Sequence, residues 1–493
     1  MPRFNAERRR RALLLTKRLE DIAAARRNLV LQLEELEEQA KTMQHEFNVL
    51  HNLDALTSNL PDEVLAMIFE AGVLPESSHR QHFGVLVSHV SSRWRKVALG
   101  TSFLWTRIVW HARNGHEGVA RVSAFLERSR LALLDVSIHQ IQREDFSPEF
   151  LRLINEQFGR CRHLRIEDGQ VVGDLVNSIN YLPNAAPLLK SIDLSAGNAS
   201  ATYAKLDMPL FPSGAPCLRT AQLHNIDIKS MHFVLPAFNS VTSLRFTNAW
   251  YGIPTHGKYD ALRNALMALP SLYHLELQLD EHDYHDTDLP IVLPTVRYMR
   301  LDIPPPHLDM LTSSIRAQNL VALSIEWWNG HVSPIGVVDQ STTRFPLLEH
   351  LILTDIAVTR PYLDAYAKRF PKIKRLTFHV DPEYKGCDIA HILRSTRFDA
   401  PEYGFQENDT SPVCDRLARW PNLEVIALSA TNTHLDSLSF DTASMEKLVS
   451  LPLCKLMLPN TLDDKAVADA IAQLKSIIQV EDYSLDWPMP FTL

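Results

Sequence analysis

Apolar residues recur at alternating steps of three and four over the first fifty residues of the chain. No Pro or Gly interrupts the series, and the acidic residues between 34 and 38 fall outside it. This heptad spacing predicts one long helix over residues 1–56. Two interpretations stay open, because pairing with another chain and packing against the rest of the same protein produce the same stripe. The seam consists of Ala12, Leu15, Leu19, Ile22, Arg26, Leu29, Leu33, Leu36, Ala40, Met43, Phe47 and Leu50.

From residue 131 onward a different pattern repeats, in which an apolar residue is followed by two more, three and five positions later. A weaker copy at Leu393 fills a gap between the copies at Ile373 and Leu423. The mean spacing of about 27 residues suits a unit of one strand and one helix. The copies begin at Leu133, Cys161, Leu189, Leu218, Val241, Leu272, Val296, Leu320, Leu348, Ile373, Leu393, Leu423 and Leu453.

Proline supports this repeat independently, because it stands two residues before seven of the thirteen starts. Pro ends a preceding helix and is tolerated as the first residue of a strand, so we expect it at each junction. Such units stack into an arc with a parallel sheet inside. A last helix over 463–478 and the tail after it are predicted to form a C-terminal cap. The prolines are Pro187, Pro216, Pro270, Pro294, Pro346, Pro371 and Pro421.

A short helical module is predicted between the long helix and the repeats, over residues 57–111. Leu60 and Pro61 precede two acidic residues, as at the start of a helix. The apolar stripe of that helix is Val64, Leu65, Ile68 and Phe69. A second helical segment carries Val87, Val90, Trp94 and Val97, and the module closes on Leu104 and Trp105.

The order of these motifs resembles the F-box, by which substrate receptors dock on the Skp-family adaptor of cullin-based ubiquitin ligases. The resemblance is carried by the Leu-Pro opening, by residues 90–95 around Trp94 and by the Leu-Trp close. Ser91 stands where the family usually has Cys, and the segment 72–83 is longer than usual. The resemblance implies adaptor contact or a role in module integrity for Leu60, Pro61, Ile68, Phe69, Trp94 and Trp105.

The repeats resemble the leucine-rich-repeat horseshoes found behind an F-box, in particular in F-box proteins of mushroom-forming fungi. That family usually places Asn or Cys three residues beyond the second strand leucine, whereas this chain has Gly169, Gly197 and Ile226 at such positions. We therefore expect irregular repeats. The predicted fold class is α/β, a leucine-rich-repeat-like solenoid of parallel strands plus helices over 112–493, preceded by a helical F-box and a long N-terminal helix.

Composition narrows the function classes. With 45% hydrophobic and 22% charged residues the chain is typical of globular proteins. A net charge of −8 argues against general nucleic-acid binding, and five widely spaced cysteines fit no metal or redox motif. No apolar run reaches the length of a membrane span, and no signal-peptide core follows the start. We expect no membrane association and a cytoplasmic and/or nuclear location.

The strongest indication of an enzyme is the segment 252–259, which nearly matches a phosphate-binding loop and contains the lysine of such a loop, Lys258. Tyr259 replaces the magnesium-binding hydroxyl, and Pro254 lacks an N–H. The acids and histidines of 281–286 are better explained as a polar loop than as a zinc site. We predict no catalytic residue, no metal site and no cofactor.

Aromatic residues outside the module leave two interpretations open. Trp110, the pair at 250–251 and the pair at 327–328 are expected to serve either as exposed recognition residues or as packing residues. We expect a non-catalytic substrate receptor whose partners are the adaptor, through it a cullin, and an unidentified protein substrate. Self-association through the N-terminal helix remains open. A protein-interaction scaffold without a ubiquitin role is the alternative, and a nucleotide-using enzyme that depends on Lys258 is a more distant one.

Overall fold

The computed structural model places two compact units along the chain, residues 1–104 and 105–493. It describes residues 2–53, 56–73, 82–111, 115–141, 148–168, 175–176, 179–197, 203–248, 258–279, 289–303, 305–326, 344–354, 366–367, 369–379, 420–429, 455–458, 472, 475–476 and 478–491. Within these ranges, no helix is both long enough and apolar enough to cross a membrane.

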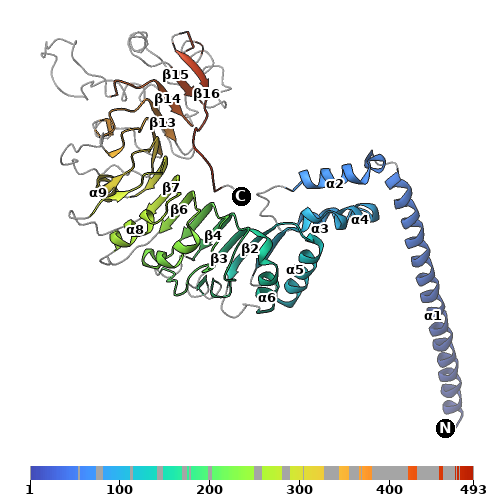
Figure 1. Cartoon of the computed structure of the whole chain (residues 1–493). Helices are drawn as coiled ribbons and strands as arrows, with labels where there is room; N and C mark the ends of the chain where they lie inside the picture. Colours follow the sequence, from blue (N-terminus) through green and yellow to red (C-terminus); the bar gives the residue numbers. More distant parts are fainter. Residues whose placement is uncertain are drawn as a thin grey trace, which may run out of the picture. The chain divides into compact units, whose positions relative to one another are not determined.

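The first unit begins with the helix α1 (Pro2–Leu53), which confirms the helix predicted from the heptad seam (Figure 1). Every described side chain from residue 7 to residue 51 is exposed, including Leu15, Leu33 and Leu36 of the seam. Within the described part of the first unit nothing covers the seam, so pairing with another chain and packing against another part of the same protein both stay open.

The rest of the first unit is a small helical module. A 3₁₀ turn, η1 (Leu56–Asn59), precedes α2 (Asp62–Ala71), and α3 (Phe83–Ser88) and α4 (Ser92–Gly100) follow. The single segment expected over 87–97 is thus two helices. The chain breaks between them because Ser91 is extended and accepts a hydrogen bond from the Trp94 N–H at 3.2 Å, as an N-cap does.

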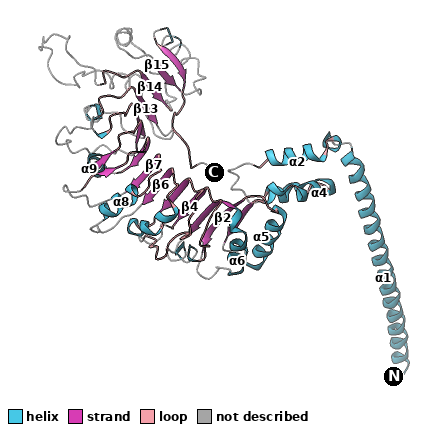
Figure 2. Ribbon diagram, in the orientation of Figure 1, coloured by secondary structure: helices cyan, strands magenta, loops and turns pink. Residues whose placement is uncertain are grey.

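In its described residues the second unit is built on a parallel sheet of fourteen strands that follow one another in sequence order, with helices on one face (Figures 1 and 2). These helices are α5 (Gly115–Ser129), α6 (Pro148–Gln157), α8 (Lys258–Met267) and α9 (Pro305–Ser314). The strands are β1 (Arg107–His111), β2 (Leu134–Ile141), β3 (Cys161–Asp168), β4 (Ser191–Ser195), β5 (Thr220–His224), β6 (Ser243–Asn248), β7 (His274–Leu279), β9 (Tyr298–Asp302), β11 (Ala322–Glu326), β12 (His350–Thr354), β13 (Arg375–His379), β14 (Val425–Leu428), β15 (Lys455–Leu458) and β16 (Gln479–Asp482). A separate pair, β8 (Ile291–Val292) and β10 (Ile315–Arg316), is also parallel.

The repeat pattern predicts the register of this sheet. Residues three positions into each copy align across the strands, as Val136, Leu164 and Ile192 do, and residues five positions in form a second aligned row. Both rows are buried, because they face the helices. The twelve strong copies correspond to β2 through β15 of the large sheet, so the parallel repeat is confirmed.

The limits of the sheet differ from the prediction in two places. Strand β1 was assigned to the helical module of 57–111, yet it pairs with β2 and places Ile108 and Trp110 in the two buried rows. The compact unit accordingly begins at Trp105. The weak copy at Leu393 lies outside the described residues, and the described strand β13 pairs directly with β14.

The repeated prolines have a more specific position than expected. At Pro187 a turn is closed by a hydrogen bond of 3.4 Å from the Leu189 N–H to the Ala186 carbonyl, and the strand begins only at Ser191. The same turn bond occurs around Pro216, Pro270, Pro346 and Pro421. Pro is favoured at the second position of such a turn because its fixed φ matches that position. Proline thus marks the turn before the strand and not the first residue of the strand.

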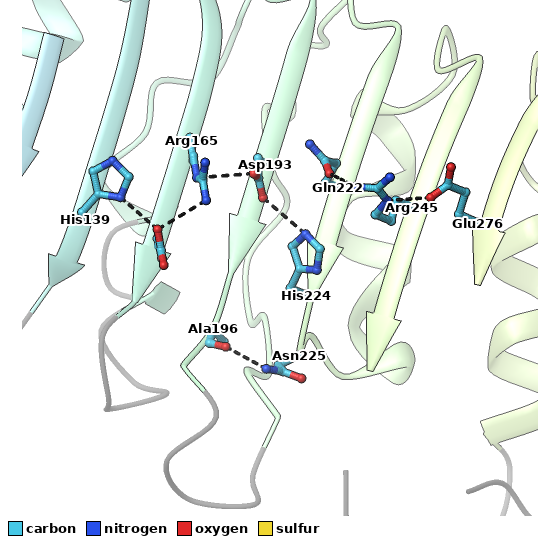
Figure 3. Close-up of polar contacts among 10 residues, drawn as sticks. His139, Arg165, Asp193, Ala196, Gln222, His224, Asn225, Arg245 and Glu276 are labelled. Carbon is cyan, nitrogen blue, oxygen red and sulfur yellow. Dashed lines mark hydrogen bonds and ion pairs between the residues drawn. The ribbon is translucent and has the colours of Figure 1, made fainter. Parts of the chain in front are cut away.

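Asn225 makes the turn hydrogen bond for which the sequence pattern offered no residue at the usual position. Asn225 has a φ of 56°, and its Nδ2 donates to the Ala196 carbonyl in the preceding turn at 2.9 Å (Figure 3). It lies one residue before Ile226, the position at which Asn was expected. Asn tolerates the left-handed conformation better than most residues, so it supplies both the backbone geometry and the bond.

Candidate functional site

The helix α2 has two apolar faces, of which only one is buried. Leu65 and Phe69 are 0% and 1% exposed and pack inside the module, whereas Val64, Met67 and Ile68 are 38%, 68% and 49% exposed. Positions separated by three and four residues share a side of a helix, so the three exposed side chains form one continuous surface. We call Pro61, Val64, Met67 and Ile68 the α2 face. An apolar surface of this kind is typical of a protein-interaction site.

Arg93 of α4 holds the beginning of α2 in place. Its Nε donates to Asp62 Oδ1 at 2.9 Å, and its Nη1 donates to the Thr57 carbonyl at 3.3 Å. Its Nη2 donates to the Leu60 carbonyl. The planar guanidinium reaches all three acceptors at once, as an ammonium group cannot. The first arginine of the Arg-Trp-Arg motif therefore fixes the position of the Leu-Pro opening.

Trp94 and Phe69 join the two helices at the centre of the module. Their ring centroids are 4.9 Å apart with planes inclined by 56°, a common geometry for aromatic pairs. Phe69 is buried, while Trp94 remains half-buried. The pair fixes α2 against α4 and thereby supports the exposed face on the other side of α2.

The six residues singled out from the sequence fall into different environments. Pro61 and Ile68 are exposed, and Leu60 and Trp94 are half-buried, so these four are accessible to a partner. Phe69 and Trp105 are buried. Trp105 belongs to the second unit, where its ring lies 5.1 Å from Phe125. It supports packing and has no surface to offer an adaptor.

Met67 was not singled out from the sequence, although it is the most exposed apolar side chain of α2. Its position three residues after Val64 places it on the same side of the helix. A helical projection of 61–71 with Leu65 and Phe69 assigned to the core would have identified it.

A second candidate site is the sheet face opposite the helices, where polar side chains form a row between the two buried apolar rows. Arg245 Nε donates to Glu276 Oε2 at 2.7 Å, and Arg245 Nη1 donates to Gln222 Oε1 at 2.9 Å (Figure 3). Arg165 lies 3.5 Å from Asp193. The aligned positions from β3 to β9 are Arg165, Asp193, Gln222, Arg245, Glu276 and Arg300.

Charges of opposite sign meet along this row, which shifts the ionisation of its members. Burial opposes ionisation of Glu276, but hydrogen bonds with His274 and Arg245 outweigh burial and lower the pKa of Glu276 to about 2. Burial raises the pKa of Asp193, although His224 and Arg165 act in the opposite direction. Burial also lowers the pKa of His224. The face therefore presents an ordered polar surface whose charges are largely matched among themselves.

The residues considered for chemistry do not form a reactive cluster in the described parts. The Tyr259 hydroxyl donates to the Leu289 carbonyl at 2.7 Å and its side chain is buried, so it packs within the fold. Burial raises the pKa of the Cys161 thiol to about 12. Trp110 is buried, and its ring stacks on that of Phe150 with centroids 4.2 Å apart, so it is a packing residue and not an exposed recognition residue. No group of three potential metal ligands occurs among the described residues.

Several sequence candidates lie outside the described residues. They are the segment 281–286, the aromatic pairs at 250–251 and 327–328, and residues 252–257 of the near-match to a phosphate loop. Comparison with protein-family models and with curated proteins finds no match for this chain.

Proposed function

We propose that this protein is the substrate-recognition subunit of a cullin-type ubiquitin ligase of the Skp-adaptor class. The helical module acts as an F-box, and the sheet unit acts as a leucine-rich-repeat-like surface that binds a protein substrate. The chain supplies no catalytic group in this role. Its contribution is to hold the substrate near the ubiquitin-loaded partner, which replaces a bimolecular encounter by an intramolecular one.

The observation that carries the proposal is the α2 face. The helix that follows the Leu-Pro opening presents Val64, Met67 and Ile68 to solvent, although these side chains are apolar. Burying apolar surface on a partner is the main favourable term in protein association. Arg93 and Trp94 of the same motif hold this helix from behind. A partner that covers the α2 face explains both the exposure and the support.

The sheet supports the second half of the proposal. A parallel repeat array presents a long continuous surface, and here that surface carries an ordered row of polar side chains. Such a surface suits another polypeptide better than a small molecule, because small ligands prefer concave and mostly apolar sites.

The helix α1 fits the proposal as a pairing element. Its seam residues Leu33 and Leu36 are 57% and 64% exposed, and the apolar spacing of the seam is that of a coiled coil. Two receptors paired in this way gain avidity. Sedimentation equilibrium of the full chain is expected to give the mass of a dimer. The double variant Leu33→Lys, Leu36→Lys is expected to give the mass of a monomer. The off-seam variant Glu35→Gln keeps the dimer, and a monomeric wild type excludes the pairing.

The adaptor role is tested by co-purification of the full chain with a recombinant Skp-family adaptor. We expect wild type to retain the adaptor and Ile68→Asp to lose it, because the new carboxylate is buried without a partner in the complex. Leu131→Asp is the matched control, since Leu131 is 92% exposed and lies in the other unit. If wild type retains no adaptor while the folded chain remains intact, the scaffold alternative replaces the ligase proposal.

A further inference from the structure

The segment after β16 lies across the sheet instead of continuing away from it. The Arg375 Nη2 of β13 donates to the Ser484 carbonyl at 2.7 Å, and Arg375 Nη1 lies 3.4 Å from Asp486 Oδ2. In Figure 1 the C-terminus lies on the side of the strands opposite the helices. The tail, residues 483–491, was expected to be part of a terminal cap, yet it contacts strands well inside the sheet.

The second half of the tail makes aromatic contacts. The Trp487 ring lies 5.8 Å from that of Tyr298 in β9 and 5.2 Å from that of His274 in β7. The Phe491 ring lies 5.6 Å from His274, and the guanidinium of Arg245 in β6 lies 4.4 Å from the centroid of Phe491. Edge-to-face and cation–π contacts of this kind are favourable and specific in orientation.

These contacts follow one line across the strands. The register of the sheet aligns Arg375, His350, Ala322, Tyr298 and His274 in a single row. Five strand spacings of about 4.8 Å separate β13 from β6, which makes about 24 Å. Seven residue steps from Ser484 to Phe491 span about 23 to 25 Å when the chain is extended. An extended segment of this length is therefore long enough to follow the row from β13 to β6.

The tail sequence suits this conformation. Trp487 and Met489 each precede a proline, and residues before Pro prefer extended backbone. Tyr483, Leu485 and Trp487 are partly covered, whereas Ser484 and Asp486 between them are exposed. Alternation of this kind means that one side of an extended segment faces the sheet.

The fit between tail and sheet is incomplete. Among the described residues, the buried atoms Arg375 Nε, His274 Nδ1 and Tyr483 Oη have no hydrogen-bond partner. The ion pair of Arg375 involves Asp486, whose side chain is 83% exposed, and exposed pairs of this kind are weak. The tail is held largely because it is tethered, which gives it an effective concentration on the order of millimolar. A segment with better-matched groups can displace it.

We infer that the row from Arg375 to His274 is a binding surface for an extended acidic-aromatic peptide segment, and that the tail occupies it in cis. The row offers a cation at one end, the small Ala322 in the middle and aromatic rings at the other end. A matching segment carries a carboxylate followed by aromatic side chains, as Asp486, Trp487 and Phe491 do. The assignment of this surface to the ligase substrate rests on the proposed function; the peptide specificity itself does not.

The test uses a fluorescein-labelled peptide with the sequence of residues 483–493 and measures its binding by fluorescence anisotropy. Wild type is compared with a chain that lacks residues 484–493 and keeps β16. A full-length Trp487→Ala, Phe491→Ala variant provides the same comparison without truncation. We expect both altered chains to bind the peptide at least tenfold more tightly than wild type, because their own tail no longer competes. Ser484→Ala, which keeps the contacting carbonyl, should behave as wild type.

The specificity is tested with a second peptide in which Asp486, Trp487 and Phe491 are replaced by Asn, Ala and Ala. At least tenfold weaker binding to the truncated chain is expected. The inference is overturned if neither altered chain binds the peptide, or if wild type binds it as tightly as the altered chains do. It is also overturned if the truncated chain binds the two peptides with equal affinity. Adaptor co-purification of the same chains separates the two proposals, since loss of adaptor binding with peptide binding intact contradicts only the ligase role.

Discussion

The ring of Trp94 in α4 lies 4.9 Å from the ring of Phe69 in α2, and this contact places the buried side of α2 against its neighbour. Phe69 and Ile68 are adjacent in sequence but face opposite environments, 1% and 49% exposed. Their substitutions therefore separate packing from binding.

We predict that Phe69→Ala destabilises the helical module by about 3 kcal/mol, the usual cost of truncating a buried aromatic ring. Ile68→Ala should change stability by less than about 1 kcal/mol, because its side chain is already half in solvent. Hydrogen–deuterium exchange of the full chain measures the change in stability of each helix separately. Faster exchange in residues 62–71 and 92–100 is expected for Phe69→Ala only. Equal acceleration in both variants would contradict the assignment of faces.

Arg93→Lys provides a second prediction for the module. Lysine keeps the charge but cannot reach Asp62, the Thr57 carbonyl and the Leu60 carbonyl together. We expect a loss of about 1 to 2 kcal/mol, reduced from the buried value because Arg93 is partly exposed. The exchange rates of residues 57–65 should rise. Arg95→Lys is the matched control and also tests the separate bond of 3.0 Å from Arg95 Nε to the Ser88 carbonyl, whose loss should affect α3 instead.

Asn225 allows the turn geometry to be tested. Asn225→Ala removes the bond to the Ala196 carbonyl and leaves an alanine at a φ of 56°, so we expect a cost of about 2 kcal/mol. Asn225→Gly also loses the bond but tolerates the conformation, so it should cost about 1 kcal/mol less. Urea unfolding measures both. A glycine variant less stable than the alanine variant would show that the conformation is not the constraint.

The stability of the sheet unit should depend on pH through His350. Burial, together with Arg375 nearby, lowers the pKa of His350 from 6.5 to about 3. The unfolded chain therefore binds a proton that the folded chain does not bind between these values. The contribution of His350 is fully present above pH 6.5 and is lost as pH falls towards about 3, at up to about 1.4 kcal/mol per pH unit.

His350→Asn tests this dependence, because Asn does not titrate and can still bond Thr377, whose Oγ1 lies 2.8 Å from His350 Nε2. The free energy of unfolding of the variant should fall less steeply than that of wild type between pH 6.5 and 4.5. His379→Asn, at the exposed end of β13, is the control and should leave the slope unchanged. Parallel slopes for wild type and His350→Asn would contradict the lowered pKa.

The repeat and its register were predictable because burial imposes a strict requirement. Two positions in each strand face the helices, so Leu164 and Ile166 of β3 and their counterparts must be apolar. The predicted end of the helical module was wrong because Ile108 and Trp110 are apolar and fit either the module or a strand. Local sequence does not state which partner an apolar residue packs against.

The polar surface could not be predicted in the same way. Arg245 and Glu276 are 31 residues apart, and neither position must be charged for the strand to fold. Their pairing follows only once the register is known. The course of the tail is less predictable still, because Arg375 and Asp486 are 111 residues apart and no repeat relates them. The exposed Met67 was within reach of a helical projection, because it lies three residues after Val64 on the side of α2 that does not pack in the module.

The central claim is that the α2 face docks on a Skp-family adaptor. The direct measurement is the dissociation constant of the purified full chain with the adaptor, determined by isothermal titration calorimetry for wild type, Met67→Asp and Leu131→Asp. We predict saturable one-to-one binding for wild type and Leu131→Asp, and at least tenfold weaker binding for Met67→Asp. No binding by folded wild-type chain, or equal affinity of wild type and Met67→Asp, contradicts the proposal.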